Sequence, residues 1–416
     1  MVGTWLIGDL SEYFGDDAHI ETNLEDASVI DLIMEVVDYE LFAIPPRWVF
    51  LKLETDTGVV GWGEPALEGR SATLVSALSE LVEDYVIGSD PRCIADLWYR
   101  MYMGDHYNNG PVLMSAIAGI DQALWDLKGR DLEKPVYELL GGPVREKVQV
   151  YQWLSGDHPD DLADVALAAV EDGYTTLGLM AHTRPARVRT REIVSNVQKR
   201  VDAVTGAVGD SIDLAVDFRG RVSTGVARQL LSMLEEYNLM FVEEPVHPTY
   251  NENLPELSSA TNIPFATGQR MYSRWDFRDV LQSQFVDIVQ PGISHAGGIT
   301  EVVNIAKMAE AHNIMLMPKC SVGPVSFAAA MHVQLSVPNS ILQEQHDEFY
   351  AEQDNEFFNY LADENPFTRS DGYMYMDDQP GLGVEMKESY IREQAGKKTS
   401  WKGPTWNYED GSVANW

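Results

Sequence analysis

The chain has 416 residues, which is long enough for two domains with separate hydrophobic cores. Its 65 acidic and 30 basic residues give a formal net charge of −35, which repels nucleic acid and argues against a nucleic-acid-binding role. No run of 18 apolar residues occurs, so a membrane-spanning helix is not expected, and two cysteines do not suggest a disulfide framework.

The acidic excess is spread along the whole chain and does not form one block. This distribution is typical of a protein that stays soluble in concentrated salt, because screening relieves its self-repulsion. We therefore predict a halophilic source. The first residues show no basic region before a long apolar run, which favours a cytoplasmic location. An ordinary acidic cytosolic enzyme is the alternative explanation of this composition.

The first 145 residues indicate an α+β segment, because extended apolar runs precede stretches with helical periodicity. The turn GGPVRE, at residues 141–146, is the preferred domain boundary. The expected elements are two antiparallel strands, read from the runs at 30–42 and 47–64, around a turn at 56–58, followed by helices over 71–86 and 116–127.

Three polar residues further along the chain each end an apolar run at an even spacing. Asp217 and Glu243 are 26 residues apart, and so are Glu243 and Gln269. A strand, a turn and a helix returning to the next parallel strand take roughly 25 residues, so this spacing predicts successive units of an α/β barrel.

Similar apolar runs continue on both sides of these three residues. Counting them gives eight strands from about Val148 to Gln345. Between them, residues 226–237 and 299–312 place apolar residues at intervals of three and four, which predicts helices with one buried face. The predicted fold class is therefore α/β, with a TIM-like barrel after the α+β segment.

Working groups in such a barrel lie where strands end and loops begin. The carboxylates of Asp217 and Glu243 are suited to a hard divalent cation such as Mg²⁺, and Gln269 can add an amide oxygen. The alternative is that these side chains cap the following helices or pair with arginines such as Arg219 and Arg270.

Motifs over nearly the whole chain resemble the enolase superfamily, in its mandelate racemase and muconate lactonizing subgroup. The likeness is greatest to the galactonate and gluconate dehydratases of that subgroup. The motifs that carry it are GWGEPALEGR, MSAIAGIDQALWDLKGR, VDFRGRVS, FVEEPV, ATGQRMYSRWDF, QPGISHAGGITE, PKCSVGPVSFAAAMH, ILQEQ and PTWNYEDGSVANW.

The resemblance implies an α+β capping domain over a modified (β/α)₇β barrel. The capping domain is expected at residues 1–145, completed by 370–416, and the barrel at 146–369. In this family, Mg²⁺ held by carboxylates binds a sugar acid, and a base removes the proton beside the substrate carboxylate before water is lost. A homo-oligomer, in the form of an octamer, is also implied.

Only some of the family's site residues have a matching residue in this chain. Asp217 and Glu243 match the first two metal ligands, and Glu344 matches the acid on the eighth strand. Four positions depart from the family pattern: Gln269 stands for the third ligand glutamate, Arg219 for a histidine, Lys319 for the catalytic histidine, and Gly292 for the aspartate that orients that histidine.

These departures reduce the negative charge expected at the site, since Arg219 and Lys319 oppose Asp217 and Glu243. Unit charges about 4 Å apart interact by roughly 4 kcal/mol at an effective dielectric near 20, so Mg²⁺ is expected to bind weakly or not at all. Lys319 is a candidate base: beside Arg219 its neutral form would be favoured, and Glu344 would assist the intermediate.

Two alternatives remain open. Lys319 can instead be a salt-bridging replacement for the absent cation, and His182, which follows the second strand, is a further catalytic candidate. At the level of function, the chain is either an acid-sugar dehydratase that acts in sugar-acid catabolism, or a descendant that binds a sugar acid or a catalytic paralogue without dehydration.

Overall fold

A computed structural model describes most of the chain. His182, one of the expected catalytic residues, lies outside the described residues. The described ranges are 34–45, 47–156, 158–181, 190–320, 322–345, 359–362, 366–397, 402–403, 405–408 and 410–414.

The amino-terminal sheet has three antiparallel strands: β1 (Val36–Ile44), β2 (Trp48–Thr55) and β3 (Val60–Gly63). The prediction of two strands around a turn at 56–58 is therefore wrong in one respect. That turn joins β2 to β3, and a separate, shorter turn joins β1 to β2. The run over 47–64 contains Gly58, whose φ of 79° lets the chain reverse inside what looks like one apolar segment.

Helices cover this sheet, as the periodicity over 71–86 and 116–127 predicts. The long helix α3 (Pro111–Asp131) packs directly on β3. The two backbones lie so close together that a side chain on Gly63 would overlap the carbonyl oxygen of Gly119. The helical elements are α1 (Ser71–Leu81), the π-helical turn η2 (Val82–Val86), α2 (Ile94–Met103), α3 (Pro111–Asp131) and α4 (Val136–Leu139).

A barrel of eight parallel strands follows in the described part of the chain, which confirms the predicted number. Consecutive strands pair in order, and β11 pairs with β4. A bridge between Leu316 and Ser340 completes the ring. The strands are β4 (Val148–Leu154), β5 (Thr176–Met180), β6 (Asp213–Asp217), β7 (Phe241–Glu243), β8 (Phe265–Thr267), β9 (Ile288–Val289), β10 (Met315–Leu316) and β11 (Gln343–Gln345).

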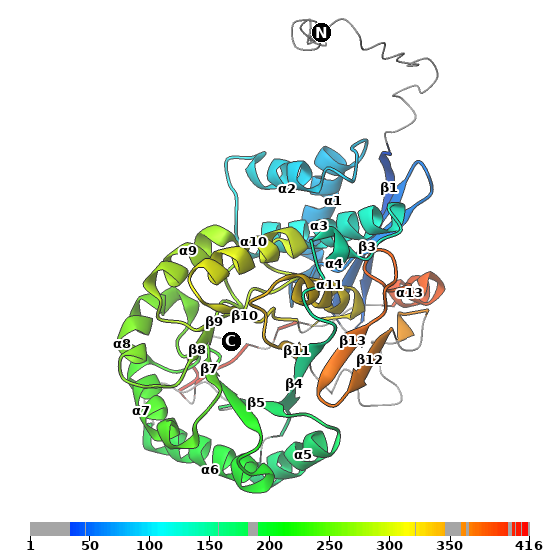
Figure 1. Cartoon of the computed structure of the whole chain (residues 1–416). Helices are drawn as coiled ribbons and strands as arrows, with labels where there is room; N and C mark the ends of the chain where they lie inside the picture. The colour runs from blue at the N-terminus through cyan, green and yellow to red at the C-terminus, as the bar shows by residue number, and fades with distance from the viewer. Residues whose placement is uncertain are drawn as a thin grey trace, which may run out of the picture.

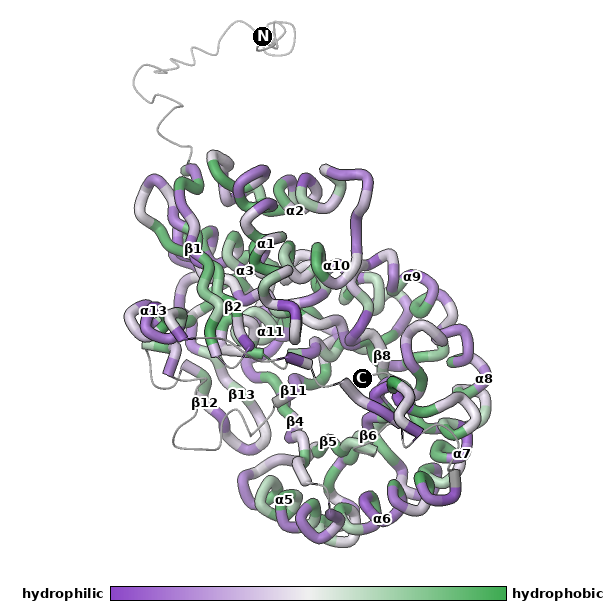
Figure 2. The backbone as a smooth tube through the Cα atoms, turned by 180° about the vertical axis from the view of Figure 1, so that it is seen from behind, coloured by the Kyte–Doolittle hydropathy of each residue, from purple (hydrophilic) through white to green (hydrophobic). Residues whose placement is uncertain are grey.

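Helices surround the strands (Figure 1), and α5 and α6 alternate between hydrophobic and hydrophilic residues along their length (Figure 2). The helices predicted over 226–237 and 299–312 are present as α7 with η3 and as α10. The elements are α5 (Pro159–Glu171), α6 (Thr190–Val208), α7 (Thr224–Leu234), η3 (Glu235–Tyr237), η4 (Pro248–Asn253), α8 (Leu254–Ser258), α9 (Arg274–Ser283), α10 (Gly298–Ala311) and α11 (Pro324–Ser336).

The chain then returns to the amino-terminal sheet. The hairpin of β12 (Phe367–Ser370) and β13 (Tyr373–Met376) pairs with β4, and α13 (Glu388–Ala395) packs against β1. The carboxyl-terminal segment thus contacts both parts of the molecule, and the boundaries expected at residues 145/146 and 369/370 stay predictions.

The buried carboxylate of Asp126 joins three of these segments. It accepts hydrogen bonds from the backbone N–H of Trp62 at 2.9 Å and of Leu382 at 2.8 Å, and from Arg130 Nε at 3.0 Å. We expect Asp126→Ala to lower the free energy of unfolding by about 3–5 kcal/mol, because it leaves two backbone N–H groups without their acceptor and removes one of the acceptors of the half-buried Arg130. Urea unfolding measures this. Asp84→Ala, at an exposed position of the same sheet-and-helix unit, should change it by less than about 0.5 kcal/mol, and equal losses in both variants would contradict the assignment.

Candidate active site

Two carboxylates lie side by side at the carboxyl ends of neighbouring barrel strands. Asp217 ends β6, Glu243 ends β7, and the two residues are in register. Both are buried, with 2% and 0% of their surface exposed. A buried carboxylate is costly unless it is paired, so its partners define what the site can do.

Gln269 is not at the same level of the barrel, although its spacing from Glu243 is even. Glu243 is in register with Ala266, and Gln269 lies two residues beyond the end of β8, after Gly268 at a φ of 125°. Among the described residues, no hydrogen bond joins Gln269 to Asp217 or Glu243. The even spacing therefore does not give an equal register, because the β7–β8 unit is shorter than the β6–β7 unit.

Lys319 reaches into the site from the segment after β10. Its backbone is bridged to Gly292, so two of the four departures from the family pattern are neighbours. Its ammonium nitrogen lies 3.1 Å from Glu243 Oε1 and 2.7 Å from Glu344 Oε1, and only 7% of the residue is exposed. One cation thus joins two buried carboxylates from opposite sides of the barrel.

Three residues around this cluster were not predicted from the sequence. Trp153 donates from Nε1 to Glu344 Oε1 at 2.6 Å, and its ring lies 5.0 Å from the Lys319 ammonium. Gln290 donates from Nε2 to Glu243 Oε2 at 2.9 Å. The hydroxyl of Tyr151 is buried and has no hydrogen-bond partner among the described residues. Alternation of inward-facing residues in β4 is the signal that places Tyr151 and Trp153 inside the barrel.

Arg219 covers Asp217. Its backbone N–H donates to Asp217 Oδ1 at 2.6 Å, and its Nε lies 3.2 Å from Asp217 Oδ2. Arg219 has a φ of 53°, and Glu244, which follows Glu243, has a φ of 46°. Such left-handed residues are uncommon outside glycine and gather at functional sites.

The charges act on each other's proton affinity. Burial raises the pKa of Glu243 to about 7 and raises that of Asp217 above its ordinary value. The neighbouring carboxylates of Glu243 and Glu344 outweigh burial and raise the pKa of Lys319. This is opposite to the lowered pKa expected for Lys319 beside Arg219, because the nearest groups to its ammonium are acidic. In this arrangement Lys319 is a cation.

The fit of the site to Mg²⁺ can be tested on these contacts. Each of the four carboxylate oxygens of Asp217 and Glu243 already receives a protein donor, from Arg219, Lys319 or Gln290. Among the residues with described positions, no group of three or more His, Cys, Asp and Glu side chains is arranged to hold a metal ion. Mg²⁺ keeps several waters and binds through one or two carboxylates, but here those carboxylates are paired with Lys319 and Arg219, whose positive charges oppose a divalent ion, so this arrangement does not fit it.

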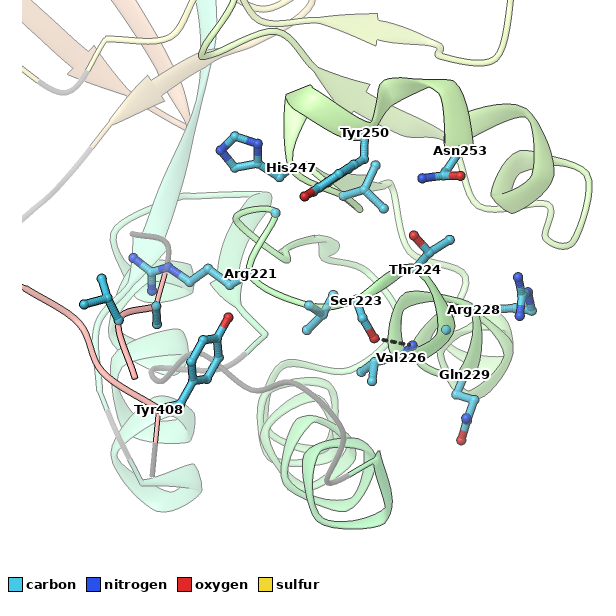
Figure 3. A pocket seen from close by; sticks show the side chains of 16 residues that line it. Arg221, Ser223, Thr224, Val226, Arg228, Gln229, His247, Tyr250, Asn253 and Tyr408 are labelled. Carbon is cyan, nitrogen blue, oxygen red and sulfur yellow. Dashed lines mark hydrogen bonds between the residues drawn. The ribbon is translucent and has the colours of Figure 1, made fainter. Parts of the chain in front are cut away.

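A pocket of about 1090 Å³ opens beside these strand ends (Figure 3). Arg221 lies between His247 on one side and Tyr408 on the other. The residue is 7% exposed, its Nε has no hydrogen-bond partner within the described ranges, and its guanidinium lies 5.0 Å from the Trp406 ring. Burial, reinforced by Arg219, lowers the pKa of Arg221 to about 10, so this pocket presents a positive charge without an acidic partner among the described residues.

In the described part of the chain, no helix combines the length and the apolar character needed to cross a membrane. Comparison with known families matches residues 45–141 to the mandelate racemase and muconate lactonizing enzyme amino-terminal domain, and residues 161–390 to the enolase carboxyl-terminal domain-like family.

Curated relatives extend this likeness over most of the chain. The D-galactonate dehydratase of Pectobacterium atrosepticum is 42% identical, and that of Ralstonia pickettii 44% identical. Each alignment covers 92% of this chain and 100% of the relative.

Solved structures agree with the fold. A mandelate racemase/muconate lactonizing enzyme from Sulfitobacter sp. superposes with a TM-score of 0.82 at 28% identity, covering 90% of this chain and 100% of that one. An enolase superfamily member from Salmonella Typhimurium has a TM-score of 0.81 at 27% identity, with 87% and 98% covered. The chain therefore belongs to the mandelate racemase and muconate lactonizing enzyme family of the enolase superfamily, as a galactonate-dehydratase-like member with an α/β barrel and a capping domain.

Proposed function

We propose that the protein is a hydro-lyase that binds a sugar acid of the aldonate class at the barrel mouth and removes water from it. The observation that carries this proposal is the cluster of Glu243, Lys319 and Glu344 at the carboxyl ends of the strands, in a chain that aligns with dehydratases over their full length. The guanidinium of Arg221, which has no acidic partner among the described residues, supports an anionic ligand, because a buried charge is stabilised by an opposite one.

The reaction needs a proton to leave the carbon beside the substrate carboxylate, and negative charge then develops on the carboxylate oxygens. The ammonium of Lys319 and the guanidinium of Arg219 are the cations at the strand ends that would stabilise this charge. Before Lys319 could act as the base, it would have to pass its own proton to Glu243 or Glu344. As an ammonium, it can instead protonate the departing hydroxyl, which leaves as water; the proton from the carbon beside the substrate carboxylate would then pass to the carboxylate of Glu344, and from there to the neutral amine of Lys319.

A second candidate function is favoured by the same ion pairs. Because Lys319 is held between two carboxylates, the resting site contains no neutral amine, and the histidines that the family uses are replaced. A protein of this kind would bind a sugar acid, or a catalytic paralogue, without turnover. Roles for His182, Gln269 and bound Mg²⁺ stay predictions, as does the expected homo-oligomer.

Turnover separates the two candidates. Aldonic and aldaric acids are incubated with the purified protein in chelator, and separately with Mg²⁺ or Mn²⁺, and 2-keto-3-deoxy acids are detected with semicarbazide. Product that disappears in Glu344→Gln supports the hydro-lyase. Binding of a sugar acid by calorimetry with no product under any of these conditions supports the binding protein.

The net charge carries a separate proposal about working conditions: the protein functions in concentrated salt, in a cytoplasmic setting. We expect its midpoint of thermal unfolding to rise between about 0.1 M and 1 M KCl, as the Debye length shortens from roughly 10 Å to 3 Å and self-repulsion weakens. A neutral osmolyte at equal osmolality is the control. A midpoint that is flat or falling with KCl would contradict the proposal.

A further inference from the structure

The carboxylate cluster contains a positive charge at the place where three acidic side chains meet. Lys319 contacts Glu243 at 3.1 Å and Glu344 at 2.7 Å, and Asp217 lies in register with Glu243 on the neighbouring strand. The three acidic residues are 0–2% exposed, so water cannot stabilise them, and they need a counter-ion of some kind. In this chain the counter-ion is covalently attached.

Neighbouring side chains fix the ammonium in this position. The Trp153 ring lies 5.0 Å from it, at a distance that suits a cation–π interaction, and the indole N–H orients Glu344. The other oxygen of Glu243 is engaged by Gln290, and the backbone N–H of Cys320 lies 3.3 Å from the second oxygen of Glu344. The carboxylates of Glu243 and Glu344 are therefore arranged around a nitrogen, and each oxygen of Asp217 and Glu243 already receives a donor from the protein.

We propose that the ammonium of Lys319 replaces the metal ion of the family as the central positive charge of the site, so that the site binds its anionic ligand without a divalent cation. The identity of that ligand as a sugar acid rests on the proposed function. The proposal that Lys319 replaces the metal ion does not rest on that function, because it concerns only the charges of this chain's own residues.

Repulsion between the Lys319 ammonium and a divalent ion, and the lack of another position for the lysine side chain, explain why the two cannot occupy the site together. A divalent ion at this place would have to approach a fixed ammonium a few ångströms away. Because two unit charges about 4 Å apart interact by roughly 4 kcal/mol at an effective dielectric near 20, the ammonium would repel a divalent ion by roughly 8 kcal/mol. The lysine side chain cannot swing out without leaving Glu243 and Glu344 buried and unpaired. Metal and ammonium are therefore mutually exclusive occupants.

Substituting Lys319 by methionine tests this, because methionine keeps much of the side-chain volume and removes the charge. In chelator, Lys319→Met should unfold at a midpoint about 5 °C or more below the wild type, since buried carboxylates lose their counter-ion. Adding Mn²⁺ or Mg²⁺ should recover at least about half of that loss, whereas the wild-type midpoint should not respond to either ion.

The amino-terminal sheet offers a matched control. Lys52 is also surrounded by three carboxylates, with Glu388 at 3.1 Å, Glu40 at 3.6 Å and Glu54 at 3.8 Å, but their side chains are 36–45% exposed. Lys52→Met should therefore be destabilised less and should show no recovery with Mn²⁺, because the exposed carboxylates around Lys52 can be stabilised by water once the lysine is gone.

A second measurement keeps the proposal testable if Lys319→Met does not fold. The electron paramagnetic resonance signal of free Mn²⁺ should be undiminished by folded wild-type protein in excess. Loss of that signal on the wild type, or a Lys319→Met midpoint that ignores Mn²⁺, would overturn the proposal. Neither measurement uses a sugar acid or turnover, so failure here is distinguishable from failure of the proposed function.

Discussion

Restoring the family residues at three positions is expected to turn the site into a metal site. In the variant Gln269→Glu, Arg219→His, Lys319→His, one negative charge is gained and two positive charges are lost, which makes the site more negative by three units near neutral pH. Because one unit charge at about 4 Å is worth roughly 4 kcal/mol at an effective dielectric near 20, we expect Mg²⁺ affinity to rise by at least about a thousandfold. Calorimetric titration with Mg²⁺ and Mn²⁺ measures this.

Activity is the second readout of the same variant. If the wild type turns over no sugar acid and the restored variant forms a 2-keto-3-deoxy acid only with metal, the binding-protein candidate gains. The three-position change needs no side chain at Gly292, where an aspartate Cβ would lie 2.9 Å from the His295 ring and force it to move. Adding Gly292→Asp to this variant is therefore a separate step. Metal affinity unchanged by the three substitutions would contradict the charge argument.

Glu64→Gln is expected to flatten the pH dependence of stability. Glu64 follows β3, is fully buried, and accepts N–H groups of Gly323 and Ser326 at the start of α11, which ties the capping sheet to the barrel. Burial raises its pKa from 4.5 to about 8. Between these values the folded state binds a proton that the unfolded state does not, so this contribution to stability is complete below pH 4.5 and is lost as the pH rises to about 8.

The loss amounts to a few kcal/mol over this window, at roughly 1.4 kcal/mol per pH unit. Glutamine does not titrate, but its amide NH₂ cannot accept the N–H that one carboxylate oxygen of Glu64 accepts, so Glu64→Gln should be less stable than the wild type at pH 4.5 and should lose less stability than the wild type toward pH 8. Urea unfolding at a series of pH values measures the slope. The exposed Glu80→Gln serves as the control, and a Glu64→Gln profile parallel to that of the wild type would contradict the pKa assignment.

The strand ends of the barrel could be read from the sequence because the burial of parallel strands leaves long apolar runs with abrupt polar stops. Asp217 and Glu243 were predicted in this way, and they lie in register as the last residues of β6 and β7. Lys319 and Glu344 lie on later apolar runs of the same rhythm, and the family motifs imply their roles. The structure brings their charged ends within 2.7 Å.

Other features depended on register and on long-range contacts, which spacing does not encode. Gln269 has the same spacing as Asp217 but lies beyond its strand, since the preceding unit is shorter. The sequence leaves two interpretations of Lys319 open, a neutral base beside Arg219 or a salt-bridging cation, and cannot decide between them because the nearest charge to its ammonium in space is Glu344, 25 residues further along the chain. Trp153 precedes Glu344 by 191 residues, so no local pattern links them.

The replacement of a divalent cation by a lysine ammonium is tested by calorimetric titration of the wild-type protein with an aldonic acid, once in chelator and once with saturating Mg²⁺. We expect the same dissociation constant in both titrations, and much weaker binding by Lys319→Met in chelator. Binding by the wild type that appears only when Mg²⁺ is present would contradict it.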